Sequence, residues 1–155
     1  MKARLPLIAS AAAFIAGCGS ASDAVTFQAP PSYQAKASFG PFMQLWSREP
    51  HTAIVLIALP VQTDLNKAMS QADLKDTRIQ KKEQIKICGG AQDAVFATLE
   101  GTAKTDPDAS DSQPSEIEFL ATDVRGKTYM AMYARPLRSA ADPAAETAIR
   151  NVCPK

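Results

Sequence analysis

The chain has 155 residues, of which 46% are hydrophobic, and its 17 Lys and Arg side chains nearly balance its 16 Asp and Glu side chains, for a net charge of +1. This composition is ordinary for a globular protein, and the length suits one domain. A nearly neutral chain offers no basic field for the phosphates of nucleic acid. We therefore discount nucleic-acid binding as a class of function.

Residues 1–17 have the features of a secretory signal. Lys2 and Arg4 form a short cationic start, and an uncharged apolar run follows at residues 5–15. A helix that spans a bilayer needs about 20 residues, whereas a signal peptide has an apolar core of about 7–15 residues before a cleavage site of small residues. Two alternatives stay open, a helix buried in the protein and an ordinary signal peptide cut after the alanines at 11–13.

The end of this segment carries a family resemblance. Ile15, Ala16 and Gly17 place one apolar and two small residues before Cys18, and this pattern resembles the lipobox of bacterial lipoproteins. The resemblance implies cleavage between Gly17 and Cys18 and lipidation of Cys18, and two or three acyl chains hold a protein stably on a membrane. Gly19 follows the cysteine where Asp would retain a lipoprotein in the inner membrane of enteric bacteria. The resemblance therefore implies the outer membrane, facing the periplasm.

Two cysteines, Cys88 and Cys153, remain in the mature chain. An even number in an exported protein favours a disulfide. This bond would close a loop of about 65 residues, which the loop-entropy model values at roughly 4 kcal/mol. The alternatives are two free thiols or a reactive Cys88 beside Gly89 and Gly90, although the sequence offers neither a C-x-x-C spacing nor a neighbouring histidine.

The mature chain is expected to consist of a tether at residues 18–24 and a single domain at residues 25–155. The tether is small and polar, and a flexible linker of this length reaches only about 14 Å. The domain should therefore lie close to the lipid surface.

Alternating or continuous apolar patterns predict about six strands in the domain. The most apolar run, 52–59, is β-branched in its middle, so it predicts a central strand that is buried on both faces. Residues 116–124 and 127–135 predict a hairpin that turns at Arg125 and Gly126. The other strands are expected at 42–46, 75–86 and 93–102, and shorter extended segments at 25–27 and 33–37.

Two stretches have apolar residues at helical spacing. The first can be capped by Thr63 or Asp64, and the second by Asp142, with Pro143 at the first helical position. The apolar stripes are Leu65, Ala68, Met69 and Ala72 in the first stretch and Ala145, Ala148, Ile149 and Val152 in the second. The sequence thus predicts an α+β fold, an antiparallel sheet of about six strands with a middle helix and a C-terminal helix packed on it.

The order of these elements over residues 25–153 resembles that of PsbP-like domains, the family that includes the bacterial DcrB-type lipoproteins. The buried strand at 52–59 and the paired final strands carry the resemblance, which includes no specific motif and therefore transfers no site residues. It implies an accessory or binding module without shared chemistry.

One basic cluster suggests a phosphate or anionic-lipid ligand. Arg78, Lys81 and Lys82 lie close together in the sequence, but Asp76 and Glu83 dilute their charge. The isoleucines at 79, 85 and 87 favour a strand with one solvated face, so we prefer that reading to contact with a membrane surface.

No catalytic residue, metal site or cofactor is expected. His51 has no partner at metal-binding or acid–base spacing, and the chain has no Gly-x-Ser-x-Gly motif. Asp106, Asp108 and Asp111 depart from the spacing of a calcium loop, which favours a solvated loop at 104–115.

Three hypotheses of function follow. We favour a lipid-anchored accessory module of the cell envelope, without catalytic activity, that binds a protein partner. A carrier of a lipid or small apolar ligand is the alternative, and it needs a groove or closed cavity lined by aromatic side chains. Its lining would come from Phe42, Trp46, Tyr129 and Tyr133, for which core packing is the simpler prediction. An enzyme would need polar groups that converge in a pocket.

Overall fold

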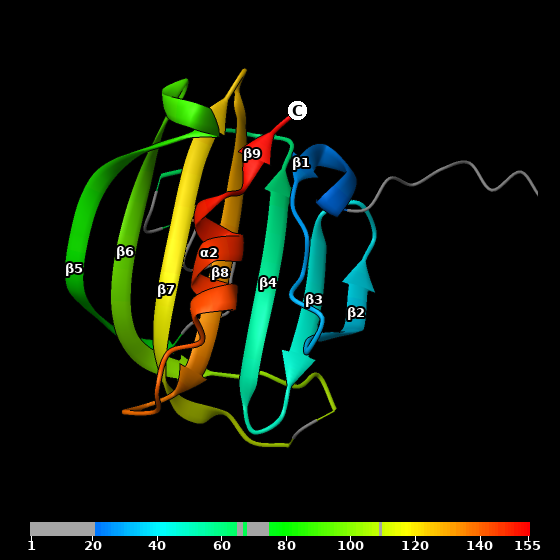
Figure 1. Cartoon of the computed structure of the whole chain (residues 1–155), viewed down its shortest axis with the longest axis vertical. Helices are drawn as coiled ribbons and strands as arrows, with labels where there is room; N and C mark the ends of the chain where they lie inside the picture. Colours follow the sequence, from blue (N-terminus) through cyan, green and yellow to red (C-terminus); the bar gives the residue numbers. More distant parts are fainter. Residues whose placement is uncertain (1–20, 65–66, 68–74, 109) are drawn as a thin grey trace, which may run out of the picture.

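The computed structural model describes residues 21–64, 67, 75–108 and 110–155. Its main element is an antiparallel sheet of seven strands in the order β2-β3-β4-β8-β7-β6-β5 (Figure 1). The strands are β2 (Gln34–Phe39), β3 (Met43–Arg48), β4 (Thr52–Leu59), β5 (Lys75–Ile87), β6 (Gln92–Ala103), β7 (Gln113–Val124) and β8 (Lys127–Pro136).

The central strand and the final hairpin are where the sequence predicts them. In β4, the first six of eight residues are buried, as expected for a β-branched apolar run between two neighbouring strands. Strands β7 and β8 pair from Val124 and Lys127 outward. Arg125 and Gly126 connect them with φ values of 53° and 76°, the left-handed backbone that a two-residue hairpin turn requires.

Short elements close the two ends of the described chain. The 3₁₀-helix η1 (Ala21–Ala24) leads into β1 (Val25–Thr26), which pairs with β9 (Cys153–Pro154) in a separate two-stranded sheet. A second 3₁₀-helix, η2 (Cys88–Gly90), joins β5 to β6.

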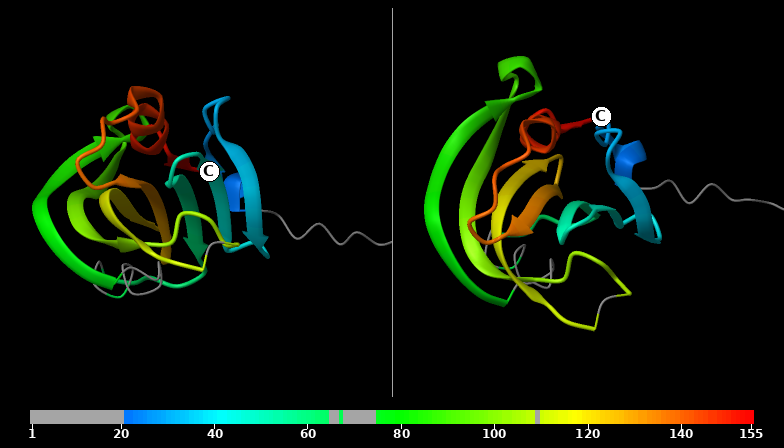
Figure 2. Two further views of the ribbon diagram at one scale, coloured as in Figure 1. Left: turned by 90° about the horizontal axis from the view of Figure 1, so that it is seen from below. Right: turned by 60° about the horizontal axis from the view of Figure 1, so that its bottom comes forward.

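Helix α2 (Pro143–Arg150) lies across one face of the strongly curved sheet (Figures 1 and 2). Asp142 caps it, because its side chain accepts a hydrogen bond from the backbone N–H of Ala144, and Pro143 occupies the first turn as predicted. Ala145 and Ile149 on its inner side, and Val152 just after its end, are fully buried.

Apolar side chains are buried on both faces of the central strands. The cluster beneath α2 includes Ile54, Leu56, Phe96, Leu120, Tyr133 and Ile149. The cluster on the opposite face includes Val55, Leu99, Ile117, Phe119, Met130 and Met132. Because successive residues of a strand point to opposite faces, β4, β7 and β8 each contribute to both clusters.

The structure confirms a mainly antiparallel fold with a helix near the C-terminus, but its details differ from the expectation. The main sheet has seven strands, one more than expected. Among the described residues, α2 is the one continuous α-helix. The expected middle helix, with Leu65, Ala68, Met69 and Ala72, lies outside the described residues. Asp64 accepts a hydrogen bond from the backbone N–H of Lys67 at 2.8 Å, as an N-cap residue does.

Cys88 and Cys153 lie side by side, as predicted from the cysteine count. Their Cα atoms are 5.2 Å apart, a separation that suits a disulfide. The pair connects the end of β5 to the strand that follows α2. Among the described residues, no helix is long and apolar enough to cross a bilayer.

Candidate functional site

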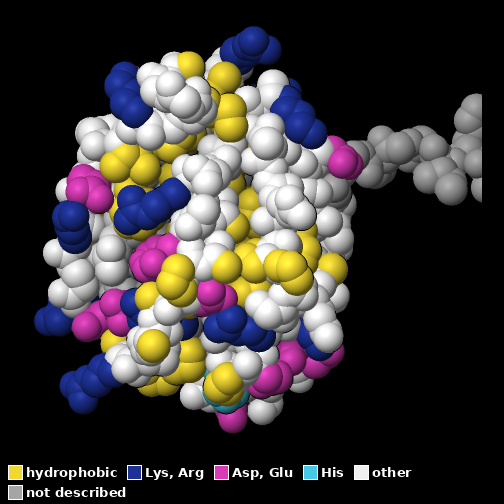
Figure 3. Space-filling view, in the orientation of Figure 1, with side chains coloured by type: hydrophobic (Ala, Val, Ile, Leu, Met, Phe, Trp, Pro, Cys, Tyr) yellow, Lys and Arg dark blue, Asp and Glu magenta, His cyan; other side chains and the backbone are white. Residues whose placement is uncertain are grey.

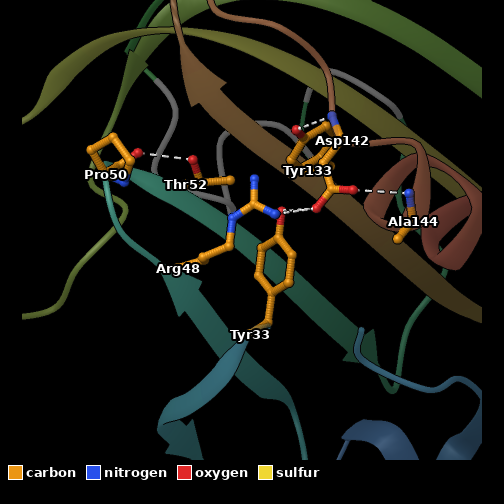
Figure 4. Close-up of polar contacts among 7 residues, drawn as sticks. All are labelled: Tyr33, Arg48, Pro50, Thr52, Tyr133, Asp142 and Ala144. Carbon is orange, nitrogen blue, oxygen red and sulfur yellow. Dashed lines mark hydrogen bonds and ion pairs between the residues drawn. The ribbon is translucent and has the colours of Figure 1, made fainter. Parts of the chain in front are cut away.

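A polar cluster surrounds Asp142 at the start of α2 (Figure 4). Arg48, at the end of β3, approaches Asp142 Oδ2 with its Nη1 at 2.5 Å, and the Tyr33 hydroxyl donates to the same oxygen at 3.2 Å. The backbone N–H of Ala144 donates to Asp142 Oδ1 at 3.0 Å, and the backbone N–H of Asp142 donates to the Tyr133 hydroxyl at 2.8 Å. The cluster therefore joins β3, β8, the start of β2 and α2.

The two tyrosines of this cluster stay neutral. Burial raises the pKa of both Tyr33 and Tyr133, because a phenolate loses its hydration there. The guanidinium of Arg48 lies 4.9 Å from the centre of the Tyr33 ring, within cation–π distance. Both oxygens of Asp142 are already bound, so the cluster has the chemistry of a structural joint and not of a base or nucleophile.

A second group of charges lies beneath α2, on β7 and β8. Arg135 Nη1 contacts Glu116 Oε2 at 2.5 Å, and its guanidinium holds the pKa of Glu116 below the usual range. Burial, followed by the neighbouring Glu146, raises the pKa of Glu118 to about 7. Glu118 is only 8% exposed, and no described group bonds its Oε2. A shifted carboxyl can mark a catalytic site, but α2 covers this one, so we expect it to act on stability.

An open groove of about 760 Å³ runs between α2 and the extended segment 26–31. Hydrophobic side chains are visible at its bottom in the space-filling view (Figure 3). Its lining consists of Thr26, Phe27, Gln28, Ala29, Pro30 and Pro31 on one side and Pro143, Ala144, Thr147, Ala148 and Asn151 on the other. None of these residues is charged. The groove is thus a mainly apolar binding surface without groups for proton transfer.

The segment that forms one wall of the groove continues from β1 and lies outside the main sheet. Phe27 packs against Trp46 with the ring centres 5.1 Å apart, and this contact holds the segment over β3. Among the described residues, the backbone groups of Phe27, Gln28 and Ala29 have no hydrogen-bond partner. This wall therefore has main-chain donors and acceptors without a partner in the described chain, which strand addition requires.

The four aromatic residues proposed as the lining of a ligand groove do not gather in one, although Phe42 and Tyr129 share a small hollow of about 160 Å³. Trp46, Tyr129 and Tyr133 are buried in the cluster beneath α2, with exposed fractions of 9%, 8% and 1%. Phe42 is 48% exposed and lies in the turn just before β3. Core packing, the simpler prediction, is confirmed for three of the four.

The candidate metal and acid–base residues do not converge. His51 is exposed in the turn between β3 and β4, with φ at 45°. In the loop at 104–115, Asp106 accepts a hydrogen bond from the backbone N–H of Asp108 at 2.9 Å. Within the described ranges, no group of three or more His, Cys, Asp or Glu residues is arranged to hold a metal ion.

The basic cluster lies on β5, at one edge of the sheet (Figure 1). Arg78 pairs with Glu100 at 3.2 Å and Lys81 with Glu83 at 2.9 Å. These side chains form a solvated strand surface, as the sequence favours. The described chain begins at Ala21, so Gly17 and Cys18 lie outside it.

Sequence reasoning missed the groove and the role of Arg48. The Pro30-Pro31 pair is the one signal for the groove, because proline keeps a segment out of a central strand. Arg48 gave no signal, since its partner Asp142 is 94 residues away.

No family model and no curated protein matches this chain. Among solved structures, the Ran-binding protein Mog1p of Saccharomyces cerevisiae is similar, with a TM-score of 0.48 and 11% sequence identity. The match covers 74% of this chain and 72% of Mog1p. A likeness this distant carries no argument about function.

Proposed function

We propose that this protein is a lipid-anchored module of the cell envelope, without catalytic activity, that binds a protein partner. The anchor is Cys18, by its resemblance to the cysteine of a lipobox, and the outer membrane facing the periplasm is the proposed location. The observation that supports the binding role is the groove between α2 and segment 26–31, which is open, mainly apolar and free of charged side chains.

The groove also indicates the chemistry of the partner. An uncharged lining disfavours a charged segment, because burial there would remove the hydration of a charge without replacing it. The unpaired main chain of Phe27, Gln28 and Ala29 suits an extended segment that adds as a strand. We therefore propose an extended, uncharged segment of an envelope protein as the occupant.

The two other classes of function receive less support. A carrier was expected to line its groove with Phe42, Trp46, Tyr129 and Tyr133, and the last three of these side chains are in the core. An enzyme would need unoccupied polar groups in a pocket. The polar groups around Asp142 instead bind one another.

Site-specific photo-crosslinking in the envelope tests this proposal. A photoreactive benzoylphenylalanine replaces Gln28 or Thr147, one on each wall of the groove, and Lys82 on β5 serves as an exposed control position. We expect one protein adduct of the same mass from both groove positions and none from the control. The variant Ala148→Trp should remove the adduct by filling the groove, while its thermal unfolding shows that it is folded.

Three results would contradict the proposal. The first is the same adduct from Lys82, and the second is an adduct that Ala148→Trp leaves unchanged. The third is an adduct to lipid in place of protein, which would favour the carrier.

A further inference from the structure

The N-terminal segment joins the domain at η1, and contacts with the sheet hold η1 in place. Ala21 is only 1% exposed, and η1 packs on β3 and β4. The backbone N–H of Ser22 donates to Gln44 Oε1 at 3.1 Å. Gln44 pairs with Leu56, so η1 lies near the end of the sheet where β3 begins and β4 finishes (Figure 1).

The distance from this place to Cys18 is short. Only Gly19 and Ser20 separate Cys18 from Ala21, and three extended residues span at most about 11 Å. A lipid on Cys18 would therefore hold this end of the domain against the bilayer. The surface around η1 is the one that must face the lipid.

Exposed apolar side chains gather at this end. Phe39 and Val61 are each 55% exposed, and Phe42 is 48% exposed. The Phe39 carbonyl accepts a hydrogen bond from the backbone N–H of Phe42 at 3.3 Å. A hollow of about 160 Å³ brings Phe42 together with Pro60, the neighbour of Val61, and with Ala24 at the end of η1. Phe42 therefore lies beside the end of η1, and Phe39 and Val61 are close to Phe42.

Cationic side chains border the apolar group. Lys127 lines the same hollow as Phe42, and Arg125 lies beside it in the β7–β8 turn. The backbone N–H of Lys155 donates to the Ala24 carbonyl at 3.1 Å. Within the described part of the chain, none of these three exposed side chains forms an ion pair, whereas Arg78 and Lys81 on β5 do.

Two carboxylates, Asp23 and Asp123, are also at this end. Asp123 accepts hydrogen bonds from the Thr128 and Gln62 side chains. The net positive charge is therefore small. Apolar contact is the main attraction to a bilayer that this end offers, and the cations add a preference for anionic headgroups.

We propose that this tether surface rests on the lipid bilayer, with its phenylalanines at the level of the headgroups. It is defined by Phe39, Phe42, Val61, Arg125, Lys127 and Lys155. The inference rests on the proposed lipid anchor at Cys18 and adds an orientation to it. Residues of mixed apolar and cationic character favour the interface between water and lipid. The basic strand β5, at the far edge of the sheet from β2, would not take part.

Hydrogen–deuterium exchange on the lipidated mature protein tests this orientation. The protein is placed in vesicles of phosphatidylcholine and phosphatidylglycerol, and the mature chain with Cys18→Ser is mixed with the same vesicles as the unanchored reference. We expect exchange in residues 39–42 and 125–127 to slow several-fold in the anchored protein, with β5 unchanged. Phe39→Ser combined with Phe42→Ser should remove the slowing, and Ile79→Ser, a change of the same kind at a 42% exposed site on β5, should not.

The outcomes separate this inference from the proposed function. Equal exchange in the anchored and unanchored proteins, with the lipid confirmed by mass, would overturn the orientation and leave the anchor intact. Slowing that survives in the double Phe variant, or that Ile79→Ser removes, would also overturn the tether surface. An unlipidated Cys18 in the protein from cells would overturn both proposals.

Discussion

The charged residues of β5 and those beside α2 are of the same types but lie in different surroundings. Arg78 on β5 and Glu100 on β6 form an ion pair whose side chains are 74% and 40% exposed. Beneath α2, the side chains of Arg135 and Glu116 are 9% and 29% exposed. An exposed pair contributes at most about 1 kcal/mol, whereas breaking a buried pair leaves one charge without hydration or partner. The charges that matter most for stability are therefore outside the densest charge cluster of the sequence.

The Cys88–Cys153 pair connects these two regions, and breaking it should have the largest effect. Replacing both cysteines by Ser should lower the free energy of unfolding by roughly 4 kcal/mol, since the bond closes a long loop of the unfolded chain. Urea unfolding with and without a reductant measures the change. The reductant should destabilise the parent protein and not the double variant. Identical midpoints for the parent with and without the reductant would mean that the thiols are free.

Removing the Asp142 side chain should have the next largest effect on the free energy of unfolding. Asp142→Ala removes the N-cap of α2 and leaves Arg48 without its partner, for an expected loss of about 2 kcal/mol. Asp93→Ala is the matched control, because Asp93 pairs with Lys86 in an exposed site where its own side chain is 72% exposed. That control should lose less than about 0.5 kcal/mol. Equal losses in the two variants would remove the distinction between the regions.

The pH dependence of stability tests the buried carboxyl beneath α2. Because the pKa of Glu118 is raised from 4.5 to about 7, the folded protein binds a proton that the unfolded chain releases. This stabilisation is complete below about pH 4.5 and is lost as the pH rises through 7. The parent protein should therefore lose about 2–3 kcal/mol of stability between about pH 5 and pH 8, and Glu118→Gln should abolish this loss. Parallel pH profiles for the variant and the parent would contradict this assignment.

The smallest effect is expected on β5. Arg78→Gln should change the free energy of unfolding by less than about 0.5 kcal/mol, since water screens its pair with Glu100. Unfolding in urea at low and high salt measures this change. A loss above about 1 kcal/mol would show that β5 and the region beside α2 do not differ as we propose.

The sequence was sufficient for features with a local cause. Strand β4 follows from a continuous β-branched run, and the β7–β8 hairpin from two alternating segments around Gly126. The start of α2 follows from Asp142 and Pro143. Each of these signals lies within a few residues of the structure it predicts.

Features that depend on distant contacts could not be predicted. The pair of Arg48 and Asp142 spans 94 residues, and the groove requires segment 26–31 to lie beside α2. The position of β5 at the sheet edge, away from η1, follows only from the strand order. The sequence therefore drew attention to the basic cluster on β5, whereas the fold puts Phe42 and Lys127 beside the tether.

The anchor at Cys18 is the central claim, and an intact mass tests it most directly. The protein is extracted from membranes and alkylated without prior reduction. We predict a chain that begins at Cys18, carries two or three acyl chains and has gained no alkyl group at Cys88 or Cys153. A chain without acyl groups would contradict the anchor, and with it the membrane orientation of the tether surface.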